Sequence, residues 1–369
     1  MKVLVTGANG FIGKNLIAAL ERIEDIEICK FDIENTLEEL SKYIEDVEFI
    51  FHLAGVNRPE SNEEFYAGNR DLTASIVEML TDKNLTIPIL MTSSIQVEKD
   101  NDYGKSKLAG EQILKDYRNK TGAGIFIYRL PNVFGKWCRP NYNSVIATWC
   151  YNIANNLPIQ VNDKDIELNL VYIDDVVQCF LSHLSGDINK DQRSFGVEET
   201  YTETLGNIEN LLCQFRDSRK ILKLSHIGTG FERALYATYL SYLPEDAFSY
   251  PLEIHSDERG NFAEVLKTID SGQLSISTSK PGITRGNHYH DTKNEKLLVL
   301  KGKAIIKLRQ IFSNKVVEYK VSDKNLEFVD IPPGYTHSIT NVGNEEMILL
   351  LWANEVFDPE NPDTYFVEV

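Results

Sequence analysis

Three histidines and a glutamate near the C-terminal end of the chain have the types and the spacing of metal ligands. His288 and His290 lie two positions apart, Glu295 follows His290 by five, and His337 comes from a separate segment. Side chains two positions apart on a strand point to the same face, so two imidazoles can converge on one ion. Glu295 and His337, from neighbouring strands, complete a set of three nitrogens and one oxygen. Such a set suits Zn²⁺, our preferred ion, and also Fe²⁺, Mn²⁺ or Ni²⁺.

Two other interpretations of these four residues stay open. One of the histidines can act as a general base, and it then cannot also be a ligand, because a metal-bound imidazole cannot take up a proton. Alternatively, the four side chains are only polar residues at the mouth of a β-barrel.

A tyrosine and a lysine in the first half of the chain have the spacing of a proton-transfer pair. In the segment YGKSK, Tyr103 and Lys107 are four positions apart at the start of an expected helix and therefore lie on one face. An ammonium group near a phenol favours the phenolate and is expected to lower the pKa of Tyr103. Such a tyrosine exchanges a proton with a carbonyl or alcohol while hydride moves to or from a nicotinamide. Ser94, in the preceding MTSS, supplies a hydroxyl for the same oxygen, although the Tyr–Lys spacing alone is common on solvated helices.

The first strand of the chain runs into a glycine-rich turn. The segment TGANGFIG places Gly7, Gly10 and Gly13 directly after the apolar run KVLV. The first glycine permits a tight turn, the second lets the backbone approach a pyrophosphate, and the third lets the next helix pack closely. An ordinary structural turn is the alternative, but the position at the first strand-to-helix turn favours a dinucleotide site.

The elements that must position these groups differ between the two halves of the chain. In the first half, apolar strand-like runs alternate with amphipathic stretches, which predicts right-handed crossovers and a parallel, doubly wound α/β sheet. From about residue 252, short β-rich runs are bounded by Gly, Pro, Asn and Asp, which predicts an all-β barrel or sandwich. We therefore expect a dinucleotide-binding domain over residues 1–245 and a β-barrel domain over residues 246–369.

The overall composition narrows the class of protein. The chain has 369 residues and a formal net charge of −17, which argues against non-specific binding to nucleic acid or to a membrane surface. It has no run of 18 or more apolar residues and no signal-like start, so we expect a soluble cytoplasmic protein. The five cysteines form no CxxC pair, and free thiols in a reducing compartment are expected.

Several motifs of the first half occur together in one known family. TGANGFIG, HLAG at 52–55, Asn69, MTSS, YGKSK and YRLPNVFG at 128–135 together resemble the extended short-chain dehydrogenase/reductases, which commonly act on nucleotide sugars. The resemblance covers residues 1 to about 180 and implies a Rossmann fold. It implies a catalytic triad of Ser94, Tyr103 and Lys107.

The same resemblance implies the residues that contact cofactor and substrate. Cofactor contacts are expected from Gly7, Asn9, Gly10, Phe11, Ile12, Gly13, Lys30, Asp32, Ile33, Leu53, Ala54, Gly55, Asn69, Tyr103 and Lys107. Substrate contacts are expected from Asn132 and Arg139.

Two features depart from that family. Ser94 and Tyr103 are only nine positions apart, which shortens a loop that often shapes the substrate pocket. The acidic residue that would hold an adenosine ribose is not evident, because Asp32 and Ile33 resemble the adenine-side pair of the family instead. Lys30 is placed to face a 2′-phosphate, so we expect NADPH rather than NADH.

The C-terminal half carries a second resemblance, to the cupins. The spacing of the first cupin motif is matched by Gly282, His288, His290, Glu295 and Gly302. The second motif, PxGxxHxxxN, is matched by Pro332, Gly334, His337 and Asn341, with Leu326 in place of its leading glycine. The resemblance implies a small double-stranded β-barrel that holds one divalent metal through the same four residues described above.

Within the cupins, one branch suggests a different role for His288. DERGNFAE at 257–264, ITRGNHYH at 283–290 and FVDIPPGYTH at 328–337 resemble the nucleotide-sugar 3,5-epimerases. In that branch the histidine at the position of His288 is the general base and no metal is needed. The ketone at C4 of the substrate acidifies the hydrogen on C3, and Arg285 is placed to bind the diphosphate. His290 and Glu295 depart from the metal-free pattern.

The two halves together resemble the bifunctional epimerase/reductases of UDP-N-acetyl-L-fucosamine synthesis, in capsular polysaccharide pathways. This resemblance implies that the cupin epimerises C3 of a UDP-2-acetamido-2,6-dideoxy-4-keto-hexose. The front domain then reduces C4 with NADPH to give UDP-2-acetamido-2,6-dideoxy-L-talose. We also expect a homodimer joined through the cupin domain.

Two rival interpretations remain. In one, the front domain is an NADPH-dependent C4 reductase and the cupin is only a metal-stabilised dimerisation module. In the other, the chain is a non-catalytic sensor of NADP(H), which the presence of Ser94, Tyr103 and Lys107 disfavours.

Overall fold

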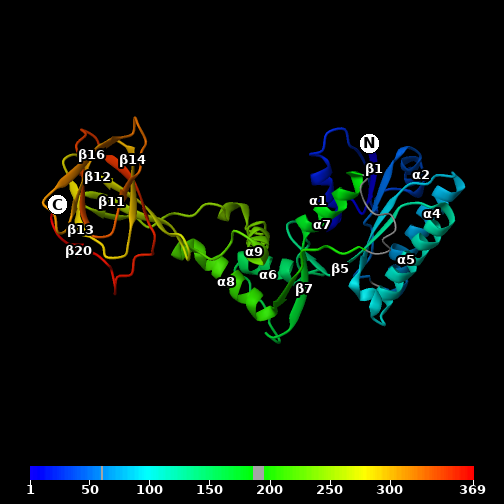
Figure 1. The fold of residues 1–369 in the computed structure, drawn as a ribbon. Helices are drawn as coiled ribbons and strands as arrows, with labels where there is room; N and C mark the ends of the chain where they lie inside the picture. Colours follow the sequence, from blue (N-terminus) through cyan, green and yellow to red (C-terminus); the bar gives the residue numbers. More distant parts are fainter. Residues whose placement is uncertain (60, 186–194) are drawn as a thin grey trace. The chain divides into compact units, whose positions relative to one another are not determined.

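The chain forms two compact units. The structure, a computed structural model, describes residues 1–59, 61–185 and 195–369 (Figure 1). Unit 1 comprises Met1–Cys213 and Gly230–Pro244, and unit 2 comprises Gln214–Thr229 and Glu245–Val369. Within the described ranges, no helix is both long enough and apolar enough to cross a membrane. The predicted domain boundary at residue 245 stays a prediction.

Unit 1 is built on a five-stranded parallel sheet with the order β2-β1-β3-β4-β5. Its strands are β1 (Lys2–Thr6), β2 (Glu27–Phe31), β3 (Phe49–His52), β4 (Ile89–Ser94) and β5 (Ile125–Leu130). All four pairings are parallel, and β3 and β4 are buried along their whole length, as expected for strands covered on both faces. The doubly wound α/β fold predicted from the sequence is confirmed.

Helices cover both faces of this sheet (Figure 1). Helix α1 packs with α7 on one face, and α4 packs with α2 and α5 on the other. The α-helices are α1 (Phe11–Leu20), α2 (Leu37–Asp46), α3 (Asn62–Tyr66), α4 (Leu72–Asp82), α5 (Asp102–Thr121), α6 (Val145–Ala154), α7 (Ile173–Ser182), α8 (Leu205–Ile221) and α9 (Gly230–Leu240). The π-helix is η1 (Ala67–Asp71), and the 3₁₀ turns are η2 (Ile95–Glu98), η3 (His183–Ser185) and η4 (Glu245–Ala247). A second sheet has the order β6-β7-β8 and comprises β6 (Asn132–Phe134), β7 (Glu167–Tyr172) and β8 (Tyr201–Thr204).

Unit 2 consists of two sheets, antiparallel except at one edge. One has the order β10-β11-β12-β19-β14-β17, and the other has the order β16-β15-β18-β13-β20. The strands are β10 (His255–Asp257), β11 (Gly260–Thr268), β12 (Gly272–Ser279), β13 (Thr284–Tyr289), β14 (Glu295–Lys301), β15 (Lys303–Gln310), β16 (Val316–Ser322), β17 (Val329–Ile331), β18 (Tyr335–Asn341), β19 (Met347–Ala353) and β20 (Tyr365–Phe366). Both sheets contribute to one apolar core, which includes Val299, Ile306 and Leu349. The all-β character of this half is confirmed, and its assignment as a cupin stays a prediction.

One strand of unit 2 comes from an earlier part of the chain. Strand β9 (Lys223–Leu224) pairs in parallel with Lys267 and Thr268 at the end of β11. The sequence pattern does not predict this pairing, because a two-residue strand leaves no alternation of apolar and polar residues to detect.

Candidate active site and metal centre

The glycine turn has the geometry of a phosphate cradle. Gly7 has a φ of 68°, and a Cβ at this position would lie 2.8 Å from the backbone of Ala54. A Cβ on Gly13 would collide with the carbonyl oxygen of Gly7. Helix α1 follows Gly10, and no side chain of the described residues caps its first turn, so its N–H groups are available to phosphate oxygens.

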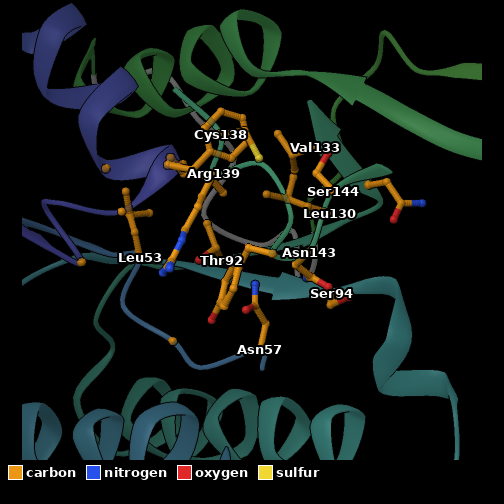
Figure 2. Close-up of a pocket in the computed structure, with 18 of the residues that line it drawn as sticks. Leu53, Asn57, Thr92, Ser94, Leu130, Val133, Cys138, Arg139, Asn143 and Ser144 are labelled. Carbon is orange, nitrogen blue, oxygen red and sulfur yellow. The ribbon is translucent and has the colours of Figure 1, made fainter. Parts of the chain in front are cut away.

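A cavity of about 1330 Å³ extends from this turn to the ends of β4 and β5 (Figure 2). Of the predicted site residues, its lining includes Gly7, Asn9, Gly10, Phe11, Ile12, Gly13, Lys30, Leu53, Gly55, Ser94, Tyr103, Lys107, Asn132 and Arg139. The volume exceeds that of a pocket for a single drug-sized ligand, so a dinucleotide and a second ligand can share it. The structure therefore brings the predicted cofactor, catalytic and substrate residues of unit 1 to one cavity.

Four predicted cofactor residues are not part of this lining: Asp32, Ile33, Ala54 and Asn69. Asp32 accepts the backbone N–H of Asn9 at 2.6 Å and of Ile33 at 2.8 Å, so it supports the glycine turn from behind. The side chain of Ile33 is 91% exposed. Lys30 does line the cavity, and its ammonium lies 2.8 Å from the carboxylate of Glu21.

The serine and the tyrosine meet at the end of β4. Ser94 is the last residue of β4, and Tyr103 lies in the first turn of α5. The side chain of Asn101 caps α5 by accepting the N–H of Gly104 at 2.7 Å, which fixes the start of the helix immediately before Tyr103. The hydroxyl of Ser94 lies near the phenol of Tyr103 and both residues line the cavity, so both can reach one substrate oxygen.

The expectation that Lys107 lowers the pKa of Tyr103 is wrong. Burial of the phenol raises the pKa of Tyr103 above its ordinary value, and the neighbouring hydroxyl of Ser94 offsets this only in part. A tyrosine with a raised pKa is protonated at neutral pH. Tyr103 is therefore set to donate a proton to a ketone oxygen, which is the direction that a reduction requires.

Lys107 lies buried beside the cavity. It is 5% exposed, its Nζ donates to the carbonyl oxygen of Thr92 at 3.3 Å, and burial lowers its pKa to about 8. Asn69, in the π-helix η1, lies behind it: a Cβ on Gly55 would meet both the Lys107 Nζ and the Asn69 Oδ1 within 2.7 Å. The Asn69 side chain accepts the N–H of Val56 at 3.0 Å and donates to the hydroxyl of Ser106, one residue before Lys107, also at 3.0 Å.

Replacing Lys107 by Met is expected to stabilise the cofactor-free protein at pH 7 by about 3 kcal/mol. The lysine has a lower pKa folded, about 8, than unfolded, 10.5, so the unfolded chain binds more protons between these values. The free energy of unfolding of the native protein therefore rises with pH relative to that of the Met variant. The difference between the two proteins disappears between pH 8 and 10.5. Thermal unfolding of both proteins across this pH range measures the stability difference, and the exposed Lys105→Met serves as the control. A gap that does not change with pH would contradict the burial of this charge.

Sequence reasoning missed several residues that line the cavity, among them Thr92, Gln96, Trp137, Asn143 and Tyr242. Trp137 has a φ of 68°, which is rare for a bulky side chain and leaves no signal in the sequence. Tyr242 comes from far along the chain, and its hydroxyl donates to the carbonyl oxygen of Cys138 at 2.5 Å.

The two predicted substrate residues, Asn132 and Arg139, both line the cavity. The guanidinium of Arg139 lies 5.3 Å from the centre of the Tyr142 ring, and Figure 2 shows the Arg139 side chain reaching into the cavity toward Leu53. The Asn132 amide donates to the carbonyl oxygen of Asn169 at 3.1 Å.

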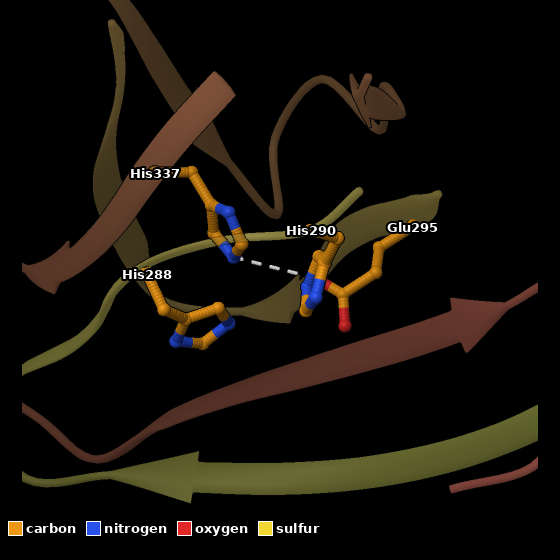
Figure 3. Close-up of side chains that lie close together, drawn as sticks. All are labelled: His288, His290, Glu295 and His337. Atoms are coloured by element: carbon orange, nitrogen blue, oxygen red, sulfur yellow. Dashed lines mark ion pairs between the residues drawn. The ribbon is translucent and has the colours of Figure 1, made fainter. Parts of the chain in front are cut away.

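In unit 2 the four predicted metal ligands come together (Figure 3). One nitrogen or oxygen atom of each of His288, His290, Glu295 and His337 lies within 4.8 Å of the other three. The Oε2 atom of Glu295 is 3.3 Å from the Nε2 atom of His337 and 3.6 Å from the Nε2 atom of His290. Three nitrogens and one oxygen therefore converge, as the sequence predicts.

A β-bulge in β13 directs His288, and His290 just after the strand, toward the cluster. The register between β13 and β18 shifts between Gly286 and His288, and the extra residue, Asn287, has a φ of 60°. After the shift His288 lies opposite His337. Without the bulge the alternation of the strand would turn His288 and His290 to the other face.

The cluster fits a divalent metal. The Nε2 atom of His290 is buried without a hydrogen-bond partner among the described residues. The distances of 3.3 and 3.6 Å between ligand atoms are close to the edge of a tetrahedron with metal–ligand bonds of about 2.0–2.1 Å, which is about 3.4 Å. Burial and the neighbouring His337 lower the pKa of His288 to about 4, so its imidazole is neutral, the form that binds a metal or accepts a proton.

Arg285, the predicted diphosphate contact, already has partners inside unit 2. Its Nε donates to the hydroxyl of Ser279 at 3.0 Å, and its Nη2 donates to the carbonyl oxygen of Thr278 at 3.1 Å. The carboxylate of Asp257 lies 3.9 Å away. Its role toward a diphosphate stays a prediction.

Two family models match the two halves of the chain. The NAD dependent epimerase/dehydratase family matches residues 3–194. The polysaccharide biosynthesis C-terminal domain matches residues 255–365.

Relatives similar over the full chain agree with this division. A UDP-2-acetamido-2,6-beta-L-arabino-hexul-4-ose reductase from Pseudomonas aeruginosa is 52% identical over 369 residues, which is all of this chain and 99% of the relative. The crystal structure of the capsular polysaccharide assembling protein CapF from Staphylococcus aureus is 49% identical, covers both chains completely and superposes with a TM-score of 0.93. A structure of CapF with the inhibitor 3-isopropenyl-tropolone is 45% identical with a TM-score of 0.89. From its matched residues, its parallel sheet and its glycine cradle, this chain belongs to the NAD-dependent epimerase/dehydratase family.

Proposed function

We propose that unit 1 reduces the C4 ketone of a UDP-linked 2-acetamido-2,6-dideoxy sugar to give UDP-2-acetamido-2,6-dideoxy-L-talose. The observation that carries this proposal is that Ser94, Tyr103 and Lys107 line the same dinucleotide cavity, with the hydroxyl of Ser94 near the phenol of Tyr103. Tyr103 donates its proton to the ketone oxygen, and a bound nicotinamide supplies the hydride. The substrate in the name of the Pseudomonas aeruginosa relative, a UDP-linked 2-acetamido 4-ketose, supports this choice.

NADPH is the proposed cofactor. Support comes from Lys30, which lines the cavity, and from Asp32, whose carboxylate is occupied by two backbone N–H groups and is not turned to a ribose. The partner of Lys30, Glu21, is exposed and can release the ammonium to a 2′-phosphate.

We further propose that unit 2 is a cupin that inverts C3 of the 4-keto sugar before the reduction. A divalent ion, preferably zinc, would be held by His288, His290, Glu295 and His337, and would polarise the C4 carbonyl so that the hydrogen on C3 becomes acidic. Support comes from the Nε2 atom of His290, which is buried and has no hydrogen-bond partner among the described residues. The CapF inhibitor is a tropolone, whose adjacent oxygens suit a divalent metal, and this also favours a metal site.

The proposal leaves two alternative roles for His288, metal ligand or general base. As a ligand it cannot also remove the C3 proton, and another residue must then act as the base. As the base it leaves His290, Glu295 and His337 as three protein ligands, which is the number typical of catalytic zinc.

Hydrogen exchange at C3 tests the proposed epimerase. The 4-keto substrate is incubated in D₂O without NADPH, and we expect deuterium at C3 by NMR. His337→Ala, which removes one ligand, should lose exchange but keep reduction of an already epimerised ketone. Removal of the metal with a chelator should have the same effect, and returning zinc should restore exchange.

The outcomes separate the proposals. Absence of exchange in the native protein with stoichiometric metal would leave unit 2 as a metal-stabilised dimerisation module, the alternative function. Full exchange after removal of all metal would instead favour the metal-free mechanism with His288 as base. The homodimer through unit 2 and the cytoplasmic location stay predictions.

A further inference from the structure

The C-terminal segment of the chain lies along β13, the strand that carries His288 and ends just before His290. Strand β20 pairs in antiparallel fashion with β13, so that Phe366 lies opposite His288 and Tyr365 opposite Tyr289. The N–H of Val367 donates to the carbonyl oxygen of Asn287 at 3.0 Å, at the bulge that turns His288 into the cluster. The end of the chain therefore supports the backbone of the proposed metal site.

Asp363 binds the loop that connects His290 to Glu295. Its carboxylate accepts the backbone N–H groups of Asp291 at 2.9 Å, Thr292 at 3.0 Å and Lys293 at 2.8 Å. It also accepts the hydroxyl of Thr292 at 3.1 Å. Three consecutive N–H groups thus converge on one side chain from a distant part of the sequence.

The backbone of Asp363 contacts a proposed ligand directly. The Nδ1 atom of His290 is 2.5 Å from the carbonyl oxygen of Asp363. Because a carbonyl oxygen only accepts, Nδ1 must carry the proton and donate it, which leaves the lone pair on Nε2. Nε2 is the buried atom that faces Glu295 at 3.6 Å. The φ of Asp363, 39°, is a left-handed conformation that few side chains adopt readily.

We propose that Asp363 is a positioning residue of the metal site. Its carboxylate holds the loop between His290 and Glu295, and its carbonyl oxygen fixes the tautomer and the ring orientation of His290. Such partners of ligating histidines commonly change metal affinity 10- to 100-fold when they are removed. The inference rests on the proposed metal site in unit 2.

Three substitutions separate the carboxylate from the backbone conformation. Asp363→Ala removes the carboxylate and disfavours the left-handed backbone. Asp363→Gly removes the carboxylate but tolerates that backbone, and Asp363→Asn tolerates it while keeping one carbonyl acceptor. The matched control is Asp358→Asn, an exposed turn aspartate of the same segment that accepts the N–H of Glu360 at 2.9 Å and touches no proposed ligand.

The test measures metal binding rather than activity. Full-length protein is stripped of metal and titrated with Zn²⁺ against a competing chelator, and with Co²⁺, whose visible spectrum reports ligand geometry. We expect Asp363→Ala to bind about 10- to 100-fold more weakly and to show an altered Co²⁺ spectrum. Asp363→Gly and Asp363→Asn should lie between this variant and the native protein, and Asp358→Asn should match the native protein.

The possible failures are distinguishable. Native affinity and a native Co²⁺ spectrum in Asp363→Ala would overturn the positioning role while leaving the metal site intact. A lower melting temperature of the metal-free variants with unchanged metal affinity would likewise show that Asp363 stabilises the fold but does not position the metal ligands. If the native protein itself binds neither ion, the proposed metal site fails and this inference fails with it.

Discussion

Tyr103→Phe is expected to lower kcat for NADPH-dependent reduction by about 10²- to 10⁴-fold, the usual contribution of a positioned proton donor. Burial raises the pKa of the Tyr103 phenol, so it carries a proton that the ketone oxygen can receive. Phenylalanine keeps the ring and its contact with Phe65, whose centre is 5.8 Å away, but has no proton to give. Loss of NADPH absorbance with saturating 4-keto substrate measures the effect.

Two controls separate proton donation from damage to the cavity. The affinity of Tyr103→Phe for NADPH should stay near that of the native protein, because the glycine cradle lies apart from the hydroxyl. Deuterium exchange at C3 should also persist in this variant, because that chemistry is assigned to unit 2. A variant that still reduces the ketone within a few-fold of the native rate would remove Tyr103 from the reaction.

The parts of the fold and site that the sequence predicts are those encoded in short segments. The alternation of apolar runs predicts the parallel sheet, and TGANGFIG lies at the end of β1 as expected. The two-position spacing of His288 and His290 predicts that their side chains share a face, and strand pairing with the bulge at Asn287 brings that face to Glu295 and His337. Local spacing fixes these features, and tertiary packing preserves them.

The features that the sequence does not reveal depend on burial or on distant partners. The pKa of Tyr103 follows its burial rather than the nearby lysine, and burial is a property of the whole domain. Asp363 meets His290 although the two are 73 positions apart in the sequence, without a motif to mark the pair. The left-handed backbone at Trp137 is likewise set by the surrounding loop.

A buried carboxylate joins the elements that hold the catalytic serine and tyrosine. Glu111, one turn after Lys107 on α5, is 1% exposed. Its two oxygens accept from the Nε of Arg129 at 2.9 Å and from the Nη2 of Arg129 at 2.7 Å, while the hydroxyl of Ser93 donates to it at 2.7 Å. Lys115 adds an ammonium at 3.0 Å. One side chain thus connects α5 to β4, at the residue before Ser94, and to β5.

Glu111→Ala is therefore expected to lower the free energy of unfolding by about 3 kcal/mol, the lower end of the range for breaking a buried ion pair, because Arg129 is partly exposed. Burial alone would raise the pKa of Glu111, but the hydrogen bonds from Arg129, Ser93 and Lys115 bring it below its ordinary value of 4.5. This stabilisation is fully present above pH 4.5 and is lost as the pH falls through the lower folded value. Denaturant unfolding at pH 7 and at acidic pH measures the difference, which should shrink in acid.

The exposed Glu98 provides the matched control for this prediction. It lies 3.8 Å from the Nη1 atom of the same arginine, and its side chain is 78% exposed, so Glu98→Ala should change stability little. Glu111→Gln should fall between the two, since an amide keeps the volume and one acceptor oxygen but loses the charge. Because Ser93 precedes Ser94, Glu111→Gln should also lower kcat more than it weakens NADPH binding. Equal effects of Glu98→Ala and Glu111→Ala would show that the buried pair does not hold these elements together.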